Sequence, residues 1–260
     1  CNDVMMHMAA DLGATRFAKY VRSFGFGSKT GIDLPGEAEG GIFSKEKLHQ
    51  VELATSSFGQ GQTVTMIQLA SAFSAVINGG NYYQPHVVKE INSESGAVVS
   101  SNDNTLVKRV VSEDASKLIR KYLEKTVEDD EGTANPARVK GYVIGGKTGT
   151  AEKWPRNEGK YLVSFAGFTP TDKPELMIYV VIDEPHVSDQ AHSTYATEFA
   201  SEVLKDVLPM LGIYKQTGKS DSAKKITLPS TKKGNQLLEV PKGGFSSSTY
   251  KVAKSKKNNG

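Results

Sequence analysis

The sequence has little cysteine and no long hydrophobic run. Cys1 is the single cysteine among 260 residues, which excludes an internal disulfide and a cysteine-based metal site. The longest apolar stretches, such as residues 177–182, are far shorter than the roughly 20 residues that a membrane-spanning helix needs. The chain opens with Cys1-Asn2-Asp3, without an initiator methionine or a signal-like segment. We therefore expect a fragment of a longer polypeptide, with any membrane anchor upstream of it.

Charge is divided unevenly along the chain. The formal net charge is +3, but residues 215–260 hold eleven lysines against Asp221 and Glu239, which leaves residues 1–214 mildly acidic. Because the basic segment combines lysine with Ser, Thr and Gly and has little apolar periodicity, it predicts a disordered tail or linker. Attraction of this tail to anionic wall polymers or lipid head groups is the alternative. The pattern does not indicate a folded surface for nucleic acid.

The remaining residues, 1–214, show the periodicities of a folded domain. Helices are expected at residues 4–12, 17–24, 44–48, 65–78, 112–123 and 193–211, a hairpin at 86–91 and 97–99, and strands at 141–152, 161–168 and 175–183. Met5, Met6 and Met8 are expected to fill a core. Helices, then three consecutive strands, then a final helix predict an α/β fold of the α+β kind, with an antiparallel sheet covered by helices on both faces.

The strongest chemical pattern is the segment Gly145-Gly146-Lys147-Thr148-Gly149-Thr150-Ala151-Glu152. The two-residue period of a strand puts Lys147 and Gly149 on one face and Thr148 and Thr150 on the other. Gly149 lets a ligand lie against the strand and bond its backbone. The lysine ammonium and the threonine hydroxyls suit an anionic group such as a carboxylate.

The same segment also matches a phosphate-binding loop as a string. Residues 141–148 read Gly-x-x-x-x-Gly-Lys-Thr. A phosphate loop must lead into a helix whose N-terminal amides face the phosphate. Here Val143 and Ile144 favour a strand, and the segment runs on toward a turn at Trp154-Pro155. The nucleotide interpretation is therefore disfavoured.

Further motifs precede and follow this strand in a fixed order. They are Phe24-Gly25-Phe26-Gly27, Lys29-Thr30-Gly31-Ile32-Asp33-Leu34-Pro35-Gly36-Glu37, Gly59-Gln60-Gly61, Gln68-Leu69-Ala70, Asn78-Gly79-Gly80, Gly132-Thr133-Ala134 and Phe165-Ala166-Gly167-Phe168. With the Lys-Thr-Gly strand, this series resembles the transpeptidase domain of class B penicillin-binding proteins, members of the penicilloyl-serine transferases. The likeness covers roughly residues 1–185. It implies a β-lactamase/D,D-transpeptidase-like fold, present here as an incomplete domain that needs its upstream part.

The resemblance also implies acyl transfer on peptidoglycan stem peptides that end in D-Ala-D-Ala. Lys147 would polarise the network around a nucleophilic serine. Thr148 and Thr150 would hold the terminal carboxylate, and the Thr150 N–H would donate to the oxyanion. Asn2 would position the donor peptide. The same groups would capture β-lactams, and neither a metal nor an organic cofactor is implied.

Part of the family's machinery is missing from this chain. The resemblance aligns Asn2 with the Asn of a Ser-x-Asn motif, so that motif's serine and the Ser-x-x-Lys nucleophile motif would lie upstream. The chain by itself is therefore expected to be inactive. Ser44 with Lys47 and Ser100 with Asn102 imitate the two motifs. Ser44 is better explained as a helix cap, and Ser100 lies in a polar turn.

Other interpretations stay open at this point. The fold could serve as a non-catalytic partner-binding module, or belong to a β-lactamase or an antibiotic-sensor domain. Trp154 is expected either to line the substrate groove or to cover the sheet edge. The acidic run at residues 128–131 is expected to be a solvated turn and not a metal site. The resemblance implies that the parent protein acts on the extracytoplasmic face of the bacterial cell membrane.

Overall fold

The computed structural model describes residues 2–215, so the predicted tail lies outside it except for Lys215. The helices are α1 (Asn2–Leu12), α2 (Ala14–Ser23), α3 (Gln50–Ser56), α4 (Met66–Ile77), α5 (Glu113–Glu128) and α6 (Thr194–Met210), with 3-10 turns η1 (Lys45–Lys47) and η2 (Asn135–Ala137). The strands are β1 (Asn81–Tyr83), β2 (Glu90–Asn92), β3 (Val98–Ser101), β4 (Leu106–Arg109), β5 (Gly145–Glu152), β6 (Tyr161–Thr169) and β7 (Leu176–Asp183). None of the described helices has the length and apolar character to cross a membrane.

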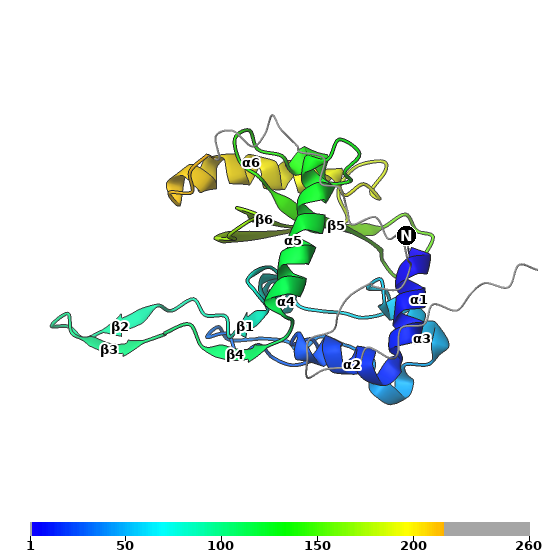
Figure 1. Cartoon of the computed structure of the whole chain (residues 1–260), viewed down its shortest axis with the longest axis horizontal. Helices are drawn as coiled ribbons and strands as arrows, with labels where there is room; N and C mark the ends of the chain where they lie inside the picture. The colour runs from blue at the N-terminus through cyan, green and yellow to red at the C-terminus, as the bar shows by residue number, and fades with distance from the viewer. Residues whose placement is uncertain (1, 216–260) are drawn as a thin grey trace, which may run out of the picture.

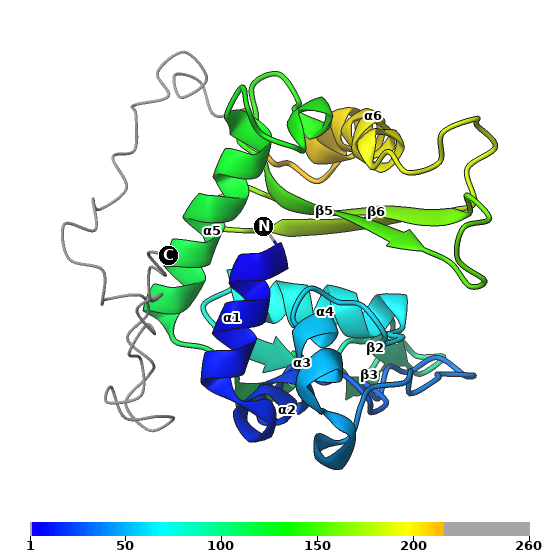
Figure 2. The same ribbon diagram turned by 90° about the vertical axis from the view of Figure 1, so that its right-hand side faces the viewer.

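One half of the molecule, here called the sheet lobe, is built on the antiparallel sheet β5-β6-β7. Helix α6 covers one face of this sheet, and α4 lies below the other face (Figure 2). On the α4 side, the ring of Phe73 lies 6.1 Å from that of Phe168. The predicted antiparallel sheet with helices on both faces is confirmed.

The core of the sheet lobe lies between the sheet and α6. Phe165 of β6 and Val180 of β7 share one face because the side chains of paired residues lie side by side. They pack with Ala200, Leu204 and Leu208 of α6, and all of these side chains are buried. The buried stripe of α6 has small residues such as Ala200 in its N-terminal half, where the helix can lie close to the sheet, and the larger Leu204 and Leu208 in its C-terminal half.

The other half, here called the helical lobe, contains α1 to α4 and two small sheets. Strands β1 and β4 form one sheet, and β2 and β3 form a hairpin that extends away from the rest of the molecule (Figure 1). Helix α4 begins with a capping box between Thr65 and Gln68. The buried Gln68 amide also donates to the carbonyls of Ser28 (2.7 Å) and Glu39 (2.8 Å). The glycine-rich loop of residues 24–44 is thus fixed to α4.

Two carboxylates of the same loop accept hydrogen bonds from backbone N–H groups, Glu37 from within the loop and Asp33 from the segment that follows β1. Glu37 accepts hydrogen bonds from Thr30 and from the N–H of Gly31. Desolvation opposes its ionisation, but these bonds hold its pKa below the ordinary value. The N–H groups of Val88 and Val87 donate to Asp33 at 2.8 Å and lower its pKa in the same way. This loop has no β ladder of its own, so side chains pair with its backbone instead.

The structure corrects several sequence predictions. The helix expected at residues 44–48 is a single 3-10 turn, and the Ser44 side chain bonds Glu46 instead of capping the turn. The strand predicted from residue 141 begins at Gly145, because a turn at Gly141 with φ +90° precedes it. Met5 and Met8 are 43% and 41% exposed, so the core role predicted for them is wrong in this structure.

Candidate active site

The predicted catalytic strand lies at an edge of the sheet. In the described part of the chain, β5 pairs with β6 alone. In both views the N-terminal end of α1, which begins at Asn2, points toward β5 (Figures 1 and 2). Lys147 pairs with Ala166, which pairs with Tyr179, so these three side chains lie on one face of the sheet. The predicted Asn2 and Lys147 therefore come from two elements that approach each other.

The ammonium group of Lys147 is held close to its own strand. Its Nζ atom donates to the carbonyl of Thr148 at 2.6 Å. The side chain keeps solvent-exposed surface, but the surrounding protein removes enough water from the ammonium to lower the pKa of Lys147. No carboxylate is among the causes of this shift. A desolvated cation without an acidic partner favours the binding of an anionic ligand.

The backbone of β5 presents a row of polar groups at the same edge. In an antiparallel pair, alternate residues turn their N–H and C=O groups away from the partner strand. The Ile144 N–H and the Gly146 and Thr148 carbonyls all bond to groups other than β6. The N–H of Thr150 has the same parity and faces the same edge. A carbonyl oxygen bound there would receive a backbone donor beside Lys147.

The glycines of this strand are required for packing. A Cβ atom on Gly149 would lie 2.6 Å from the Ser164 hydroxyl. On Gly146 it would lie 2.5 Å from the Phe165 ring, and on Gly145 2.6 Å from the Phe168 ring. Such distances are far inside van der Waals contact. Gly149 was predicted to allow close approach of a ligand, and it also makes room for a neighbouring strand.

Trp154 lies beyond the end of β5 and is 81% exposed, so it covers little of the sheet. The guanidinium of Arg156 lies 5.6 Å from the centre of its ring. With the amide oxygen of Gln60 oriented toward it, the same guanidinium also donates to that oxygen. The motif Gly59-Gln60-Gly61 of the helical lobe therefore meets the turn that follows β5.

The two imitation motifs are not assembled into a site. Ser44 hydrogen-bonds Glu46 next to η1, which packs against α2. Ser100 belongs to β3 and not to the polar turn predicted for it, and β3 lies in the hairpin that extends away from α1 and β5 (Figure 1). Among the described elements, neither η1 nor β3 packs extensively against β5. The structure therefore gives no support to a catalytic role for either serine.

The geometry also argues against the phosphate-loop interpretation. Thr148 is in the middle of a continuous strand that ends at Glu152, and the next element along the chain is the strand β6 and not a helix. Within residues 2–215, no group of three or more His, Cys, Asp or Glu side chains is arranged to hold a metal. The acidic run at residues 128–131 includes Glu128, whose carboxylate accepts from the N–H of Ile144 at 2.9 Å. That part of the run is structural and not a solvated turn.

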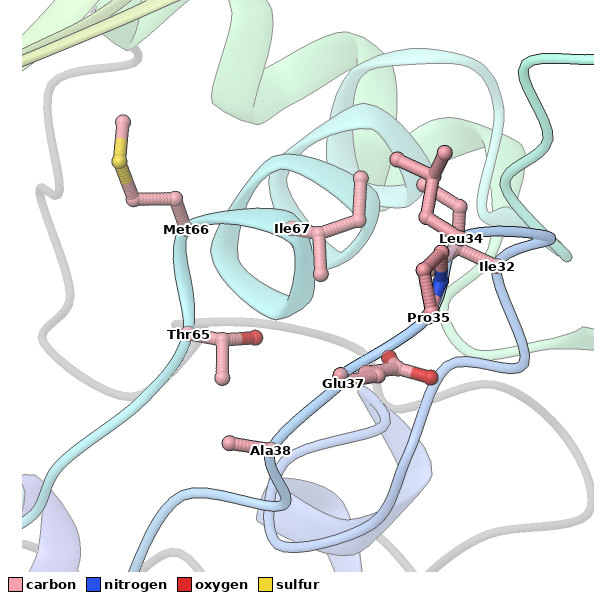
Figure 3. A pocket seen from close by; sticks show the side chains of 9 residues that line it. Ile32, Leu34, Pro35, Glu37, Ala38, Thr65, Met66 and Ile67 are labelled. Atoms are coloured by element: carbon pink, nitrogen blue, oxygen red, sulfur yellow. The ribbon is translucent and has the colours of Figure 1, made fainter.

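A shallow hollow of about 360 Å³ lies elsewhere, between the glycine-rich loop and the start of α4 (Figure 3). It is lined by Ile32, Leu34, Pro35, Gly36, Glu37, Ala38, Thr65, Met66 and Ile67. The carboxylate of Glu37 is already engaged by Thr30 and Gly31. The lining is otherwise mainly apolar and supplies no nucleophile. The hollow is therefore not a second candidate for the chemistry.

Sequence reasoning missed two polar side chains on the lysine face of the sheet. Tyr179 is hydrogen-bonded to Ser164, and burial raises the pKa of the Tyr179 phenol. Ser164 pairs with Gly149 across the sheet. Neither residue belongs to a recognisable motif, because strand register alone places them beside β5. Aligning β5, β6 and β7 by the alternation of their apolar and polar residues could have placed Ser164 and Tyr179 on the face of Lys147.

Comparison with known proteins agrees with this geometry. The sequence model of the penicillin binding protein transpeptidase domain matches residues 1–205. Stage V sporulation protein D of Bacillus subtilis is 42% identical over 247 residues, which cover 93% of this chain and 37% of that protein. A probable peptidoglycan D,D-transpeptidase, PenA of Neisseria meningitidis, is 29% identical over 77% of this chain and 32% of its own length.

Solved structures give the same assignment. Penicillin binding protein 3 of Mycobacterium tuberculosis, complexed with aztreonam, superposes with a TM-score of 0.75 at 26% identity, over 83% of this chain and 50% of that one. The chain thus spans only about a third of its sequence relatives and half of this structural one. The sheet with its covering helices has the β-lactamase-like fold of these domains. The matching family model, the relatives and the ordered motifs show that this chain belongs to the penicillin-binding protein transpeptidase family.

Proposed function

We propose that this chain is the C-terminal part of the transpeptidase domain of a serine D,D-transpeptidase, which cross-links peptidoglycan stem peptides and is acylated by β-lactams. The observation that carries the proposal is the edge of β5, where the partly desolvated Lys147 ammonium bonds the Thr148 carbonyl and the Thr150 backbone N–H faces away from β6. An ammonium and a backbone donor on one edge suit a peptide that ends in a carboxylate. The names of the relatives support the same reaction.

In this reaction a serine attacks the penultimate carbonyl of the donor peptide, and a lysine accepts the serine proton. The terminal D-Ala leaves, and an amine of a neighbouring stem peptide takes the acyl group. The Thr150 N–H donates to the developing oxyanion, and Lys147 stabilises the negative charge around the serine. The hydroxyls of Thr148 and Thr150 bind the terminal carboxylate. Asn2 positions the donor peptide, and Trp154 borders the groove.

The serine and its lysine belong to a segment that precedes residues 1–260, so this chain alone is inactive. That segment packs against the helical lobe. Val4, Met5 and Met8 of α1 expose apolar surface that it can cover. The domain acts on the extracytoplasmic side of the bacterial cell membrane, where peptidoglycan is assembled, and contacts the membrane through an anchor outside these residues. No nucleic acid takes part.

Substitution of Lys147 tests the proposal in the polypeptide that joins residues 1–260 to the segment with the serine. Lys147→Ala removes the charge, and Lys147→Arg replaces a compact ammonium with a planar fork. Both should slow acylation by a penicillin about a hundredfold or more, a loss like that of an oxyanion donor. Thr150→Ala should cost less, because its backbone N–H survives. The measurement is the second-order rate of acylation.

The control is the isolated chain of residues 1–260, which should form no adduct with a fluorescent penicillin. An adduct on Ser44, located by peptide mapping, would contradict the assignment of the nucleophile. Near-normal acylation of Lys147→Ala would remove the lysine from the mechanism. A joined polypeptide that is folded but never acylated would favour the alternative, a non-catalytic module that retains the fold for partner binding.

A further inference from the structure

Three side chains hold the backbone of the residues that lead into Lys147. The Thr169 hydroxyl donates to the carbonyl of Val143 at 2.9 Å. The N–H of Ile144 donates to Glu128 Oε1 at 2.9 Å. The hydroxyl of Thr126 is shared between the carbonyl of Leu123 in its own helix and that of Gly146. None of these contacts belongs to the β ladder, so they add to the pairing of β5 with β6.

The last turn of α5 lies close enough to β5 for these contacts to be direct. A Cβ on Gly145 would lie 3.2 Å from the backbone nitrogen of Glu124 in α5. Ile144 is fully buried, so its N–H has no access to water and needs the Glu128 carboxylate. Burial raises the pKa of Glu128, in keeping with its position against the strand.

The groups held by α5 and the groups offered to substrate belong to one row. The Ile144 N–H and the Gly146 carbonyl face the edge of β5, and the Thr148 carbonyl and Thr150 N–H follow at the two-residue period. The first half of the row is occupied by side chains of α5. Because the strand is continuous, holding the first two groups in place also fixes the positions of the Thr148 carbonyl and the Thr150 N–H relative to α5.

The other end of α5 is attached to the helical lobe. The N–H of Gly79 donates to the buried Ser116 hydroxyl at 3.0 Å, and the Arg120 guanidinium donates to the carbonyl of Ile77 at 2.8 Å. These contacts tie α5 to the C-terminal end of α4. Helix α5 therefore connects the helical lobe, which carries α1 and Asn2, to the start of β5 (Figure 2).

We propose that Thr126 and Glu128 are positioning residues. They prevent the start of β5 from shifting relative to α5 and so place Lys147 and the Thr150 N–H for acyl transfer. The inference rests on the function proposed above. Thr169 assists from β6 by holding Val143. A misplacement of about 1 Å at a reacting centre costs about a hundredfold in rate. Loosening one of the two α5 contacts allows a smaller displacement, and we expect an effect of about tenfold.

The test uses paired variants in the polypeptide that joins residues 1–260 to the segment with the serine. Thr126→Val removes the hydroxyl with little change of shape, whereas Thr126→Ser keeps it. Glu128→Ala removes the acceptor, whereas Glu128→Gln keeps an oxygen for the Ile144 N–H. The matched control is Thr197→Val, which removes a buried hydroxyl that bonds only within α6. Acylation by a penicillin is measured per folded molecule, with the binding and acylation steps separated.

Thr126→Val and Glu128→Ala should slow the acylation step about tenfold. Thr126→Ser, Glu128→Gln and the Thr197→Val control should stay within about twofold of the parent. If the control and Thr126→Val lose the same acylation rate, the Thr126 contact serves only general stability, and the proposal is overturned. If Glu128→Ala does not fold, the Thr126 pair decides the outcome by itself.

A second measurement does not depend on activity. In the joined polypeptide, hydrogen exchange of the Ile144 amide should accelerate at least tenfold in Glu128→Ala and remain slow in Glu128→Gln. Unchanged exchange of the Ile144 amide in Glu128→Ala would overturn the proposed positioning contact, whatever the acylation rate. Faster exchange in a joined polypeptide that no penicillin acylates would instead refute the proposed function, while the contact between Glu128 and the Ile144 amide would still be supported. Faster exchange with unchanged acylation would leave the contact structural only.

Discussion

The two lobes of this molecule are held together by different interactions. In the sheet lobe, Phe165, Val180 and Leu204 belong to a buried apolar core between the sheet and α6. In the helical lobe, the loop of residues 24–44 is fixed mainly by polar side chains, of which Gln68, Asp33 and Glu37 are examples. Helix α1 buries only Ala9.

The contrast follows from what each segment can bury. Apolar side chains on a regular strand or helix share one face and form a core. A glycine-rich loop has few side chains to bury and many unpaired backbone groups, so carboxylates and amides must pair with them. Resistance to unfolding should therefore come chiefly from the sheet lobe. The shape of the helical lobe should depend more on charge and hydrogen bonding.

The largest expected effect tests the sheet lobe. Phe165→Ala should lower the free energy of unfolding of this chain by about 3–5 kcal/mol, because it opens a cavity in a fully buried site. Urea unfolding at neutral pH measures the loss. Val107→Ala on the exposed strand β4 is the control and should change stability by less than about 0.5 kcal/mol. A loss below about 1 kcal/mol for Phe165→Ala would erase the contrast between the lobes.

A smaller, local effect tests the helical lobe. The pKa of Asp33 is lowered by the Val88 and Val87 N–H groups, so its stabilising contribution is present above the ordinary value of 3.8 and is lost as the pH falls through the folded value. Hydrogen-exchange protection of the Val87 and Val88 amides should fall on acidification below about pH 4. Amides of β6 should keep their protection over the same range.

Asp33→Asn separates this carboxylate from the other acids. Because Asn keeps one of the two acceptor oxygens, the variant should lose protection at one of the two amides at neutral pH and show little further change with acid. If Val87 and Val88 stay protected at acid pH in the parent, the carboxylate is not what orders the loop. Protection must then come from packing, as in the sheet lobe.

The smallest expected effect concerns α1. Met8→Ala should change the stability of the isolated chain by less than about 0.5 kcal/mol, because the side chain is already 41% exposed. The same change in the polypeptide with the preceding segment should cost more, since our proposal has that segment cover α1. Thermal unfolding of both forms gives the comparison. Equal effects in the two forms would place the covering segment elsewhere.

Local patterns predicted the regular elements well. The two-residue period of β5 correctly separated Lys147 from Thr148, and Ser112 does cap α5 through the Ala115 N–H. Helix α3 was missed because Thr55 and Ser56 lower its intrinsic helix propensity, and it is stabilised by packing against α1. The pairing of β1 with β4 was missed because a whole hairpin separates the two strands in sequence.

Contacts between elements were beyond local patterns. Helical spacing showed that Met5 and Met8 share a helix, but it could not show what covers their side of it. The candidate site residues on β5 are contiguous, so a motif is enough to nominate them. Thr126 bonds to a residue twenty positions away, and only the packing of α5 on β5 brings the two together.

The glycine pair before Lys147 bears on how lost activity would be recognised in related sequences. Gly145 and Gly146 leave room for the Phe168 and Phe165 rings, whatever chemistry the strand performs. A descendant that no longer acylates would still be selected to keep both glycines, since any side chain there would disrupt the core. Only Lys147 and the threonines that follow it would no longer be under selection and could be substituted. Retention of Gly-Gly is therefore a signature of the fold, and surveys for inactivated copies should weigh Lys147 and Thr150 instead.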